Sequence, residues 1–227
     1  MSLGKFQLLT HGTTVHGTEH RQPEPWRIPL TYYSQADPLG QFFETFAESK
    51  LRTVALIGLG ASSIACYRRS DDTPLTFYEI DPAVVRIAAN PNLFQFIAQC
   101  GHGVNVILGD GRRQIRKAEE AQYELLILDA FISDSVPTHL LTREAFETYF
   151  SKLSKQGVLL AHISNQHLDL ESVVSTLISD AGLVGRVQHY RPPDASGPCD
   201  WRSSWAVLAR DEGDLRSWHT TRVGEPC

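Results

Sequence analysis

The sequence lacks several features that would assign it to a specialised class of protein. Its four cysteines are widely spread and form no Cys-x-x-Cys pair, which argues against a zinc site or a disulfide framework and favours a reducing compartment. No apolar run approaches the length of a membrane span, and nothing resembling a secretory signal opens the sequence. Positive charge is not in excess, because the net charge is −5. This balance argues against nucleic acid as a partner and suits a small cationic substrate, although such a charge is also common on a solvated surface.

What remains is the composition of an ordinary globular protein of 227 residues, with 42% hydrophobic and 21% charged residues. The first part of the chain differs from the rest. Residues 11–17 alternate β-branched residues with glycines, as a hairpin does, and 31–33 form a further strand candidate after a proline-rich loop. We therefore predict a small β-hairpin cap over 1–48 and a larger domain over 49–227.

In the larger domain short apolar strands alternate with helices. The predicted strands cover 53–57, 75–78, 104–108, 124–128, 157–163, 185–190 and 204–209. The predicted helices cover 42–49, 64–69, 82–88, 94–100, 112–121, 142–152 and 170–180. This alternation indicates an α/β, Rossmann-like fold, in which helices cover both faces of a mainly parallel sheet.

A glycine loop follows the first of these strands. Gly58-Leu59-Gly60 stands about twenty residues before the acid that ends the next strand, Glu79, and this arrangement is typical of nucleoside binding on a parallel sheet. The glycines let the backbone approach the ligand, and the acid accepts hydrogen bonds from two ribose hydroxyls. A nicotinamide dehydrogenase shares this pattern, but it would leave the acids further along the chain without a role.

Three successive strands end in acids, namely Glu79, Asp110 and Asp129. Each alone has a structural interpretation, because Asp commonly caps helices and occupies turns. Parallel strands place their carboxyl ends at one edge of the sheet, where ligands bind in such folds. Together the three acids therefore predict a binding site at that edge.

Longer motifs surround these acids. They are Gly58-Leu59-Gly60, Glu79-Ile80-Asp81-Pro82, Gly109-Asp110-Gly111-Arg112, Leu128-Asp129-Ala130-Phe131, the run 133–142 and His162-Ile163-Ser164-Asn165. With the N-terminal run 11–17 they resemble the polyamine synthases, most closely spermidine synthase-like proteins of a bacterial branch often fused behind membrane segments. The resemblance implies the S-adenosylmethionine methyltransferase type of fold, a seven-stranded sheet with one antiparallel strand after a β-hairpin domain. It also implies a homodimer.

The resemblance also implies roles for individual residues. Asp129 is then the base that faces the attacking amine, and Asp134 is a second anchor for a diamine. Tyr33 closes over the substrate from the cap, where His16 also lines the cleft. The residues expected to bind the nucleoside are Gly58, Gly60, Glu79, Asp81, Asp110 and Gly111.

The implied reaction is aminopropyl transfer from decarboxylated S-adenosylmethionine to a diamine such as putrescine. An alkyl amine with a pKa of ~10.4 is protonated at neutral pH, and freeing its lone pair costs roughly 4–5 kcal/mol. A carboxylate at the nucleophile can bind the ammonium and take its proton. No metal is needed, and the spacing of His11, His16 and His20 does not predict a metal site.

One position departs from the family pattern. Ala61 stands in the glycine loop where polyamine synthases usually carry an Asp that binds the amino group of decarboxylated S-adenosylmethionine. Alanine cannot balance an ammonium charge, so a methyltransferase that uses intact S-adenosylmethionine is an alternative. A catalytically degenerate nucleoside-binding domain of a larger membrane protein is another. A cytoplasmic location is expected, whether the chain stands alone or forms the cytosolic part of such a membrane protein.

Four further residues have two interpretations each. His139 and His162 stand near predicted strand ends, where they either touch substrate or satisfy backbone groups in loops. Trp201 and Trp205 belong either to the core or to the rim of the cleft.

Overall fold

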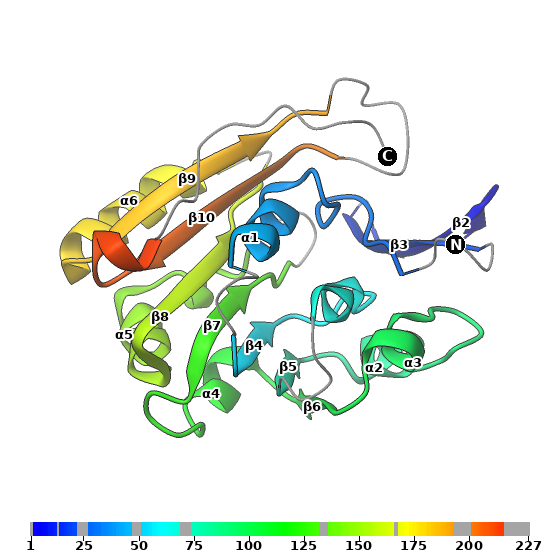
Figure 1. The fold of residues 1–227 in the computed structure, drawn as a ribbon, viewed down its shortest axis with the longest axis horizontal. Coiled ribbons are helices and arrows are strands. Elements are labelled where there is room, and N and C mark those ends of the chain that lie inside the picture. The colour runs from blue at the N-terminus through cyan, green and yellow to red at the C-terminus, as the bar shows by residue number, and fades with distance from the viewer. Residues whose placement is uncertain are drawn as a thin grey trace.

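The computed structural model describes residues 2–12, 14–21, 27–46, 51–68, 74–131, 136–165, 168–192 and 201–215. Within them lies a seven-stranded sheet with the order β6-β5-β4-β7-β8-β10-β9 (Figure 1). Its strands are Val54–Ile57 (β4), Leu75–Glu79 (β5), Val104–Leu108 (β6), Tyr123–Leu128 (β7), Leu153–His162 (β8), Val184–Tyr190 (β9) and Ser203–Ala209 (β10). Only β10 pairs antiparallel with its neighbours among these strands, which confirms the predicted fold class and the single antiparallel strand.

Helices cover both faces of this sheet (Figure 1). They are Pro38–Phe46 (α1), Pro82–Ala88 (α2), Phe96–Cys100 (α3), Gly111–Ile115 (α4), Arg143–Lys152 (α5) and Leu170–Ala181 (α6), with 3-10 helices at Ser63–Tyr67 (η1), Thr138–Leu140 (η2) and Glu212–Leu215 (η3). The N-cap residues are of the polar types that helix starts prefer, since Thr142 and Asp169 accept hydrogen bonds from the first turns of α5 and α6.

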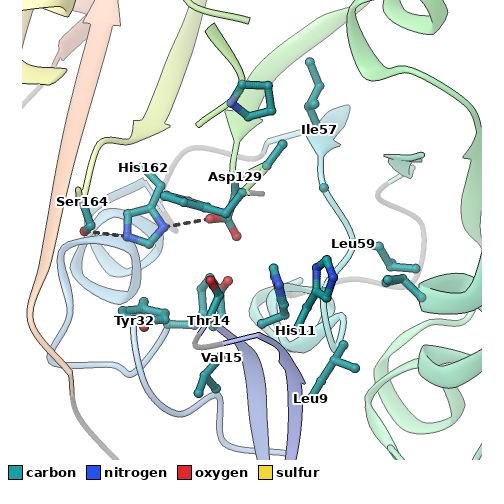
Figure 2. Close-up of a pocket in the computed structure, with 18 of the residues that line it drawn as sticks. Leu9, His11, Thr14, Val15, Tyr32, Ile57, Leu59, Asp129, His162 and Ser164 are labelled. Carbon is teal, nitrogen blue, oxygen red and sulfur yellow. Dashed lines mark hydrogen bonds and ion pairs between the residues drawn. The ribbon is translucent and has the colours of Figure 1, made fainter. Parts of the chain in front are cut away.

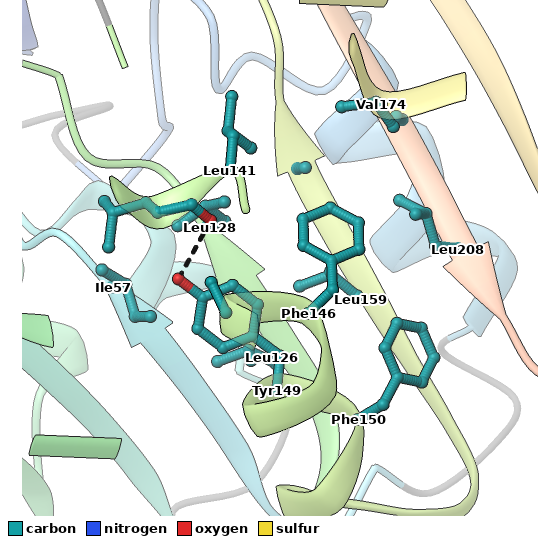
Figure 3. Packing of buried hydrophobic residues seen from close by; sticks show 14 of the residues in the cluster. Ile57, Leu126, Leu128, Leu141, Phe146, Tyr149, Phe150, Leu159, Val174 and Leu208 are labelled. Carbon is teal, nitrogen blue, oxygen red and sulfur yellow. Dashed lines mark hydrogen bonds between the residues drawn. The ribbon is translucent and has the colours of Figure 1, made fainter. Parts of the chain in front are cut away.

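The period-two alternation of the strands divides the core into two layers. On β7, Leu126 and Leu128 face the layer that contains α5 and α6, whereas Leu125 and Ile127 face the layer that contains α1. Figure 3 shows the first layer, in which the ring of Tyr149 packs among the leucines and its hydroxyl donates to the carbonyl of Leu140 at 3.2 Å. All four β7 side chains are at most 1% exposed, so the central strands are fixed from both sides.

The N-terminal segment forms a separate three-stranded sheet, β1-β2-β3. Its strands are Ser2–Leu3 (β1), Phe6–His11 (β2) and Thr14–His20 (β3), and the turn between β2 and β3 contains Gly12 in the left-handed region at φ 60°. The predicted hairpin is therefore present. We call residues 2–21 the cap sheet.

The cap sheet is docked on the larger sheet through β3. The carbonyl of His16 accepts a hydrogen bond from the Ala61 N–H at 3.1 Å. Glu19 is 3% exposed, and its two carboxylate oxygens lie 2.8 and 3.0 Å from the Gln95 N–H. Burial raises the pKa of Glu19 to about 7, although the bond from Gln95 acts in the opposite direction.

Several predicted elements differ in bounds or type, since the helix predicted over 64–69 is the 3-10 helix η1 and both α1 and β8 begin four residues earlier than predicted. Two further elements differ more. Residues 31–33 form a turn, because Thr31 has a left-handed φ of 62° and the Ser34 N–H bonds to its carbonyl; the strand prediction was wrong. The helix predicted over 112–121 is α4 and ends at Ile115, because the next bonds, Lys117 to Gln114 and Ala118 to Ile115, span three residues rather than four.

The prediction that the cysteines form no disulfide was also wrong. Cys66 in η1 and Cys100 at the end of α3 are joined, with their Cα atoms 5.0 Å apart and a sequence separation of 34. The two helices pack side by side, a proximity that sequence spacing does not reveal. The expectation of a reducing compartment rested on the absence of disulfides and loses that support.

The helices that the structure describes include none with the length and apolar character of a membrane span.

Candidate active site

A cavity of about 1100 Å³ lies at the carboxyl edge of the parallel strands, beneath the cap sheet. Figure 2 shows residues from both sheets on its walls, with Leu9, His11, Thr14 and Val15 from the cap sheet opposite Asp129 and His162. The predicted site residues that line it are Tyr33, His16, Gly58, Gly60, Glu79, Asp81, Asp110, Gly111 and Asp129. Asp134 lies outside the described residues.

The glycine loop is shaped by close backbone contacts. A Cβ at Gly58, which has φ 107°, would collide with the carbonyl oxygen of Asp129. A Cβ at Gly60 would collide with the carbonyl oxygen of His16 in the cap sheet. These two glycines therefore allow β4, β7 and the cap sheet to meet at one point.

Glu79 at the end of β5 is held by the backbone. Its carboxylate accepts the N–H of Leu59 at 2.9 Å and the N–H of Asp81 at 2.8 Å, and the residue is 7% exposed. Each oxygen keeps a lone pair that can accept a hydroxyl, so the pair of oxygens suits a diol such as that of a ribose. Asp81 itself caps α2 by accepting the Ala83 N–H at 2.7 Å.

Asp110 follows β6 and caps α4. One carboxylate oxygen accepts the Arg113 N–H at 2.8 Å, and the other lies 3.1 Å from Nε2 of His139. Gly111 next to it lets α4 approach β4, because a Cβ there would collide with the side chain of Ile57. A quarter of the Asp110 side chain is exposed, which leaves it open to a further donor from a ligand.

Asp129 at the end of β7 has a different environment. Its Oδ1 lies 2.8 Å from Nδ1 of His162, and its side chain is 8% exposed. The phenol of Tyr33 also interacts with this carboxylate. Burial, followed by the charge of Asp129, raises the pKa of Tyr33 well above its usual value, so this phenol stays a donor.

The structure shows where the four residues with two interpretations lie. His139 and His162 each bond to a site carboxylate, Asp110 and Asp129 respectively. Trp205 is fully buried, whereas Trp201 lines the cavity and meets the ring of Tyr32 edge-on. His162 was not among the site residues predicted from sequence, although the motif that it shares with Ser164 could have indicated it.

Ala61, where polyamine synthases usually carry an acid, is 1% exposed. It lies against Gly17 of the cap sheet, where an added Cβ would collide with the Ala61 side chain. The docking of the cap sheet therefore requires a small side chain at this position, because a larger one would displace the cap sheet.

Comparison with known proteins supports the same fold. The chain resembles a probable spermidine synthase from Corynebacterium glutamicum ATCC 13032, with a TM-score of 0.67 and 17% identity over 90% of this chain and 72% of that one. It also resembles an S-adenosylmethionine-dependent methyltransferase from Archaeoglobus fulgidus, with a TM-score of 0.53 and 11% identity over 75% of this chain and 90% of that one. The fold is that of spermidine synthases and methyltransferases.

At the sequence level the chain is similar to the polyamine aminopropyltransferase of Vibrio vulnificus (strain CMCP6). The two are 29% identical over 192 residues, which cover 82% of this chain and 60% of that protein. The chain thus spans less than two thirds of the length of this relative. No protein-family model matches the chain.

Within the described residues, no group of three His, Cys, Asp or Glu side chains has an arrangement that could hold a metal ion. The rings of His11 and His16, two of the three histidines considered from sequence, have their centroids 6.3 Å apart.

Proposed function

We propose that this chain binds an S-adenosyl nucleoside and transfers the aminopropyl group of decarboxylated S-adenosylmethionine to a small amine such as putrescine. The observation that carries the proposal is the presence of Glu79, Asp110 and Asp129 on the walls of one cavity. The similarity to an aminopropyltransferase over most of this chain supports the same reaction.

In the proposed complex the nucleoside lies over β5 and β6. Glu79 accepts the two ribose hydroxyls with the lone pairs that Leu59 and Asp81 leave free. Asp110 accepts the exocyclic amine of adenine, and Gly58, Gly60 and Gly111 allow close approach of the backbone. The sulfonium then points toward Asp129, at the carboxyl end of β7, which lies on the other side of β4 from β5.

Asp129 acts on the acceptor amine. Its carboxylate binds the ammonium, takes one proton and leaves the nitrogen lone pair directed at the carbon next to the sulfonium. The new C–N bond forms as the C–S bond breaks, and the bonding electrons stay on sulfur, which becomes a neutral thioether. His162 holds the carboxylate in place beside the phenol of Tyr33, and Tyr32 and Trp201 line the adjacent wall.

The test is spermidine formation from putrescine and decarboxylated S-adenosylmethionine. Asp129→Asn should lower kcat by about 10²- to 10⁴-fold, the usual contribution of a general base. Asp169→Asn is the matched control, because Asp169 is an exposed N-cap of α6 outside the cavity and Asn caps equally well. No product from the wild-type chain, or equal product from the Asp129 variant, would rule the proposal out.

A methyltransferase that uses intact S-adenosylmethionine is the second candidate. The burial of Ala61 under Gly17 favours it, since this position offers no carboxylate to the amino group of the decarboxylated nucleoside. Calorimetry with both nucleosides separates the two candidates, because tighter binding of the carboxylated form supports methyl transfer. Binding of either nucleoside without turnover of any amine would instead support a degenerate domain.

The assembly and location remain predictions from the sequence. We propose a homodimer in the cytoplasm, with the chain either alone or as the cytosolic part of a longer membrane protein. Sedimentation of the purified chain tests the dimer. Fluorescence of a tagged full-length protein tests the location.

A further inference from the structure

A chain of three hydrogen bonds runs from β10 to Asp129. The backbone N–H of Ser204 donates to Oγ of Ser164 at 2.8 Å. Oγ of Ser164 lies 2.7 Å from Nε2 of His162, and Nδ1 of His162 lies 2.8 Å from Oδ1 of Asp129. Figure 2 shows the last three residues in a row along one wall of the cavity.

The two ends of this chain determine its direction. A backbone N–H can only donate, so the Ser164 hydroxyl oxygen accepts there and its own proton is free to go to His162. An ionised carboxylate can only accept, so Nδ1 of His162 carries a proton and donates it to Asp129. In a neutral imidazole Nε2 is then the acceptor of the Ser164 hydroxyl, and every donor points toward the carboxylate.

The imidazole of His162 is held in one orientation by aromatic rings. The indole of Trp205 stacks on it with 4.3 Å between ring centroids and 7° between planes. Phe131 meets it at 4.7 Å and 67°, and Tyr32 at 5.4 Å and 55°. The His162 side chain is 3% exposed, so rotation of the ring would break both hydrogen bonds in a site that water hardly reaches.

We propose that His162 is a positioning residue for the base Asp129, fixed as its Nδ1-protonated tautomer by Ser164. The inference rests on the proposed function, because it takes Asp129 as the group that receives the proton of the acceptor amine. The donated bond fixes Oδ1, and the remaining lone pairs of the carboxylate can accept the ammonium. A carboxylate with one fixed oxygen presents a single orientation to the nucleophile.

The spacing of Ser164, His162 and Asp129 is also that of a nucleophilic triad. The bond from the Ser204 N–H favours the positioning role, since it draws on one of the two lone pairs of the serine oxygen that would have to attack and weakens that oxygen as a nucleophile. We therefore assign Ser164 to fixing the tautomer rather than to covalent chemistry.

The tautomer is measured directly by NMR of the protein with ¹⁵N-labelled histidine, assigned by comparison with His162→Phe. The expected result is a protonated Nδ1 and an unprotonated Nε2 at His162 above neutral pH. The opposite tautomer would overturn the proposal. This measurement needs no turnover, so it decides the hydrogen-bond chain even if the amine transfer itself is not found.

Kinetics test the positioning role. His162→Phe keeps a ring against Trp205 but removes the donor, and kcat should fall about 10- to 100-fold, which corresponds to one charge-assisted hydrogen bond, with the nucleoside KM unchanged. His162→Asn retains an N–H near the position of Nδ1 and should recover most of that loss. His102→Phe is the control, because His102 is exposed and does not line the cavity.

Three outcomes would contradict the proposal. One is wild-type kcat in His162→Phe, and another is equal loss in the Phe and Asn variants, which would indicate packing alone. The third is labelling of Ser164 by a fluorophosphonate, which would identify a nucleophilic triad. If His162→Phe does not fold, Ser164→Ala replaces it, and a mixture of tautomers at His162 is then the expected result.

Discussion

Glu79 and Asp129 are buried carboxylates at the same edge of one sheet, yet they are held in different ways. Glu79 accepts two backbone N–H groups, from Leu59 and Asp81. Asp129 is hydrogen-bonded to the side chain of His162 from β8 and interacts with the phenol of Tyr33 from the loop before α1. A carboxylate held by backbone groups is insensitive to most side-chain changes around it, whereas Asp129 depends on several distant residues.

This difference indicates that the Glu79 end and the Asp129 end of the cavity have different roles. The Glu79 end has the geometry to recognise a fixed shape, a diol on a nucleoside. The Asp129 end has a donor network that can be adjusted by changes in β8 and β10 without disturbing the glycine loop. Four experiments test this division, in order of decreasing expected effect.

The first experiment exchanges each carboxylate for its amide. Asp129→Asn should lower kcat by about 10²- to 10⁴-fold and leave nucleoside binding unchanged. Glu79→Gln should weaken nucleoside binding by about 10- to 100-fold, because an NH2 group would face the N–H of Leu59 or Asp81. Calorimetry and saturation kinetics separate the two effects. The division is wrong if both variants lose mainly affinity.

The second experiment changes Gly58, which lies between the Glu79 end and the Asp129 end of the cavity. Gly58→Ala would place a Cβ against the carbonyl oxygen of Asp129 at a φ of 107°, and the free energy of unfolding should fall by at least about 3 kcal/mol. Gly182→Ala is the control, because its φ is 63° but nothing lies within 4 Å. That variant should cost only about 1–2 kcal/mol. Chemical denaturation measures both, and equal losses would argue against the contact.

The third experiment removes the disulfide beside the Glu79 end. The double variant Cys66→Ser, Cys100→Ser should lose about 2–4 kcal/mol of stability, because the bond closes a loop with a sequence separation of 34. Since η1 directly follows the glycine loop, nucleoside affinity should fall more than kcat does. The reduced wild-type chain should behave like the double variant. Identical melting of reduced and oxidised protein would contradict this prediction.

The fourth experiment concerns the cap sheet, which covers both ends. The folded pKa of Glu19 is about 7, above its ordinary value of 4.5, so the folded chain favours the protonated side chain. The stability that this side chain contributes is therefore complete below pH 4.5 and is lost as the pH rises through about 7. Between pH 6 and pH 8 the loss should be roughly 1 kcal/mol. Glu19→Gln keeps an oxygen for the Gln95 N–H and should remove this slope. Denaturation at both pH values measures it, and an unchanged slope would assign the pH dependence to other groups.

The sequence predicted most of the fold and the Glu79 end of the cavity. Strand periodicity, the N-caps and the acids that end β5 and β7 are local features, and the larger sheet has the predicted strands in the predicted class of fold. The turn at residues 31–33 was missed because its left-handed Thr31 does not follow from a β-branched and aromatic run.

The residues of the strands, the carboxyl edge and the acids along it could therefore be predicted from sequence, since each depends on neighbours within one strand and turn. Three other features followed only from the packing of the folded chain: the His162 bond to Asp129, the disulfide between Cys66 and Cys100, and the burial of Ala61 under Gly17. Each joins side chains or backbone from elements far apart in the chain. Such contacts depend on how helices and sheets pack, which no local pattern of residues records.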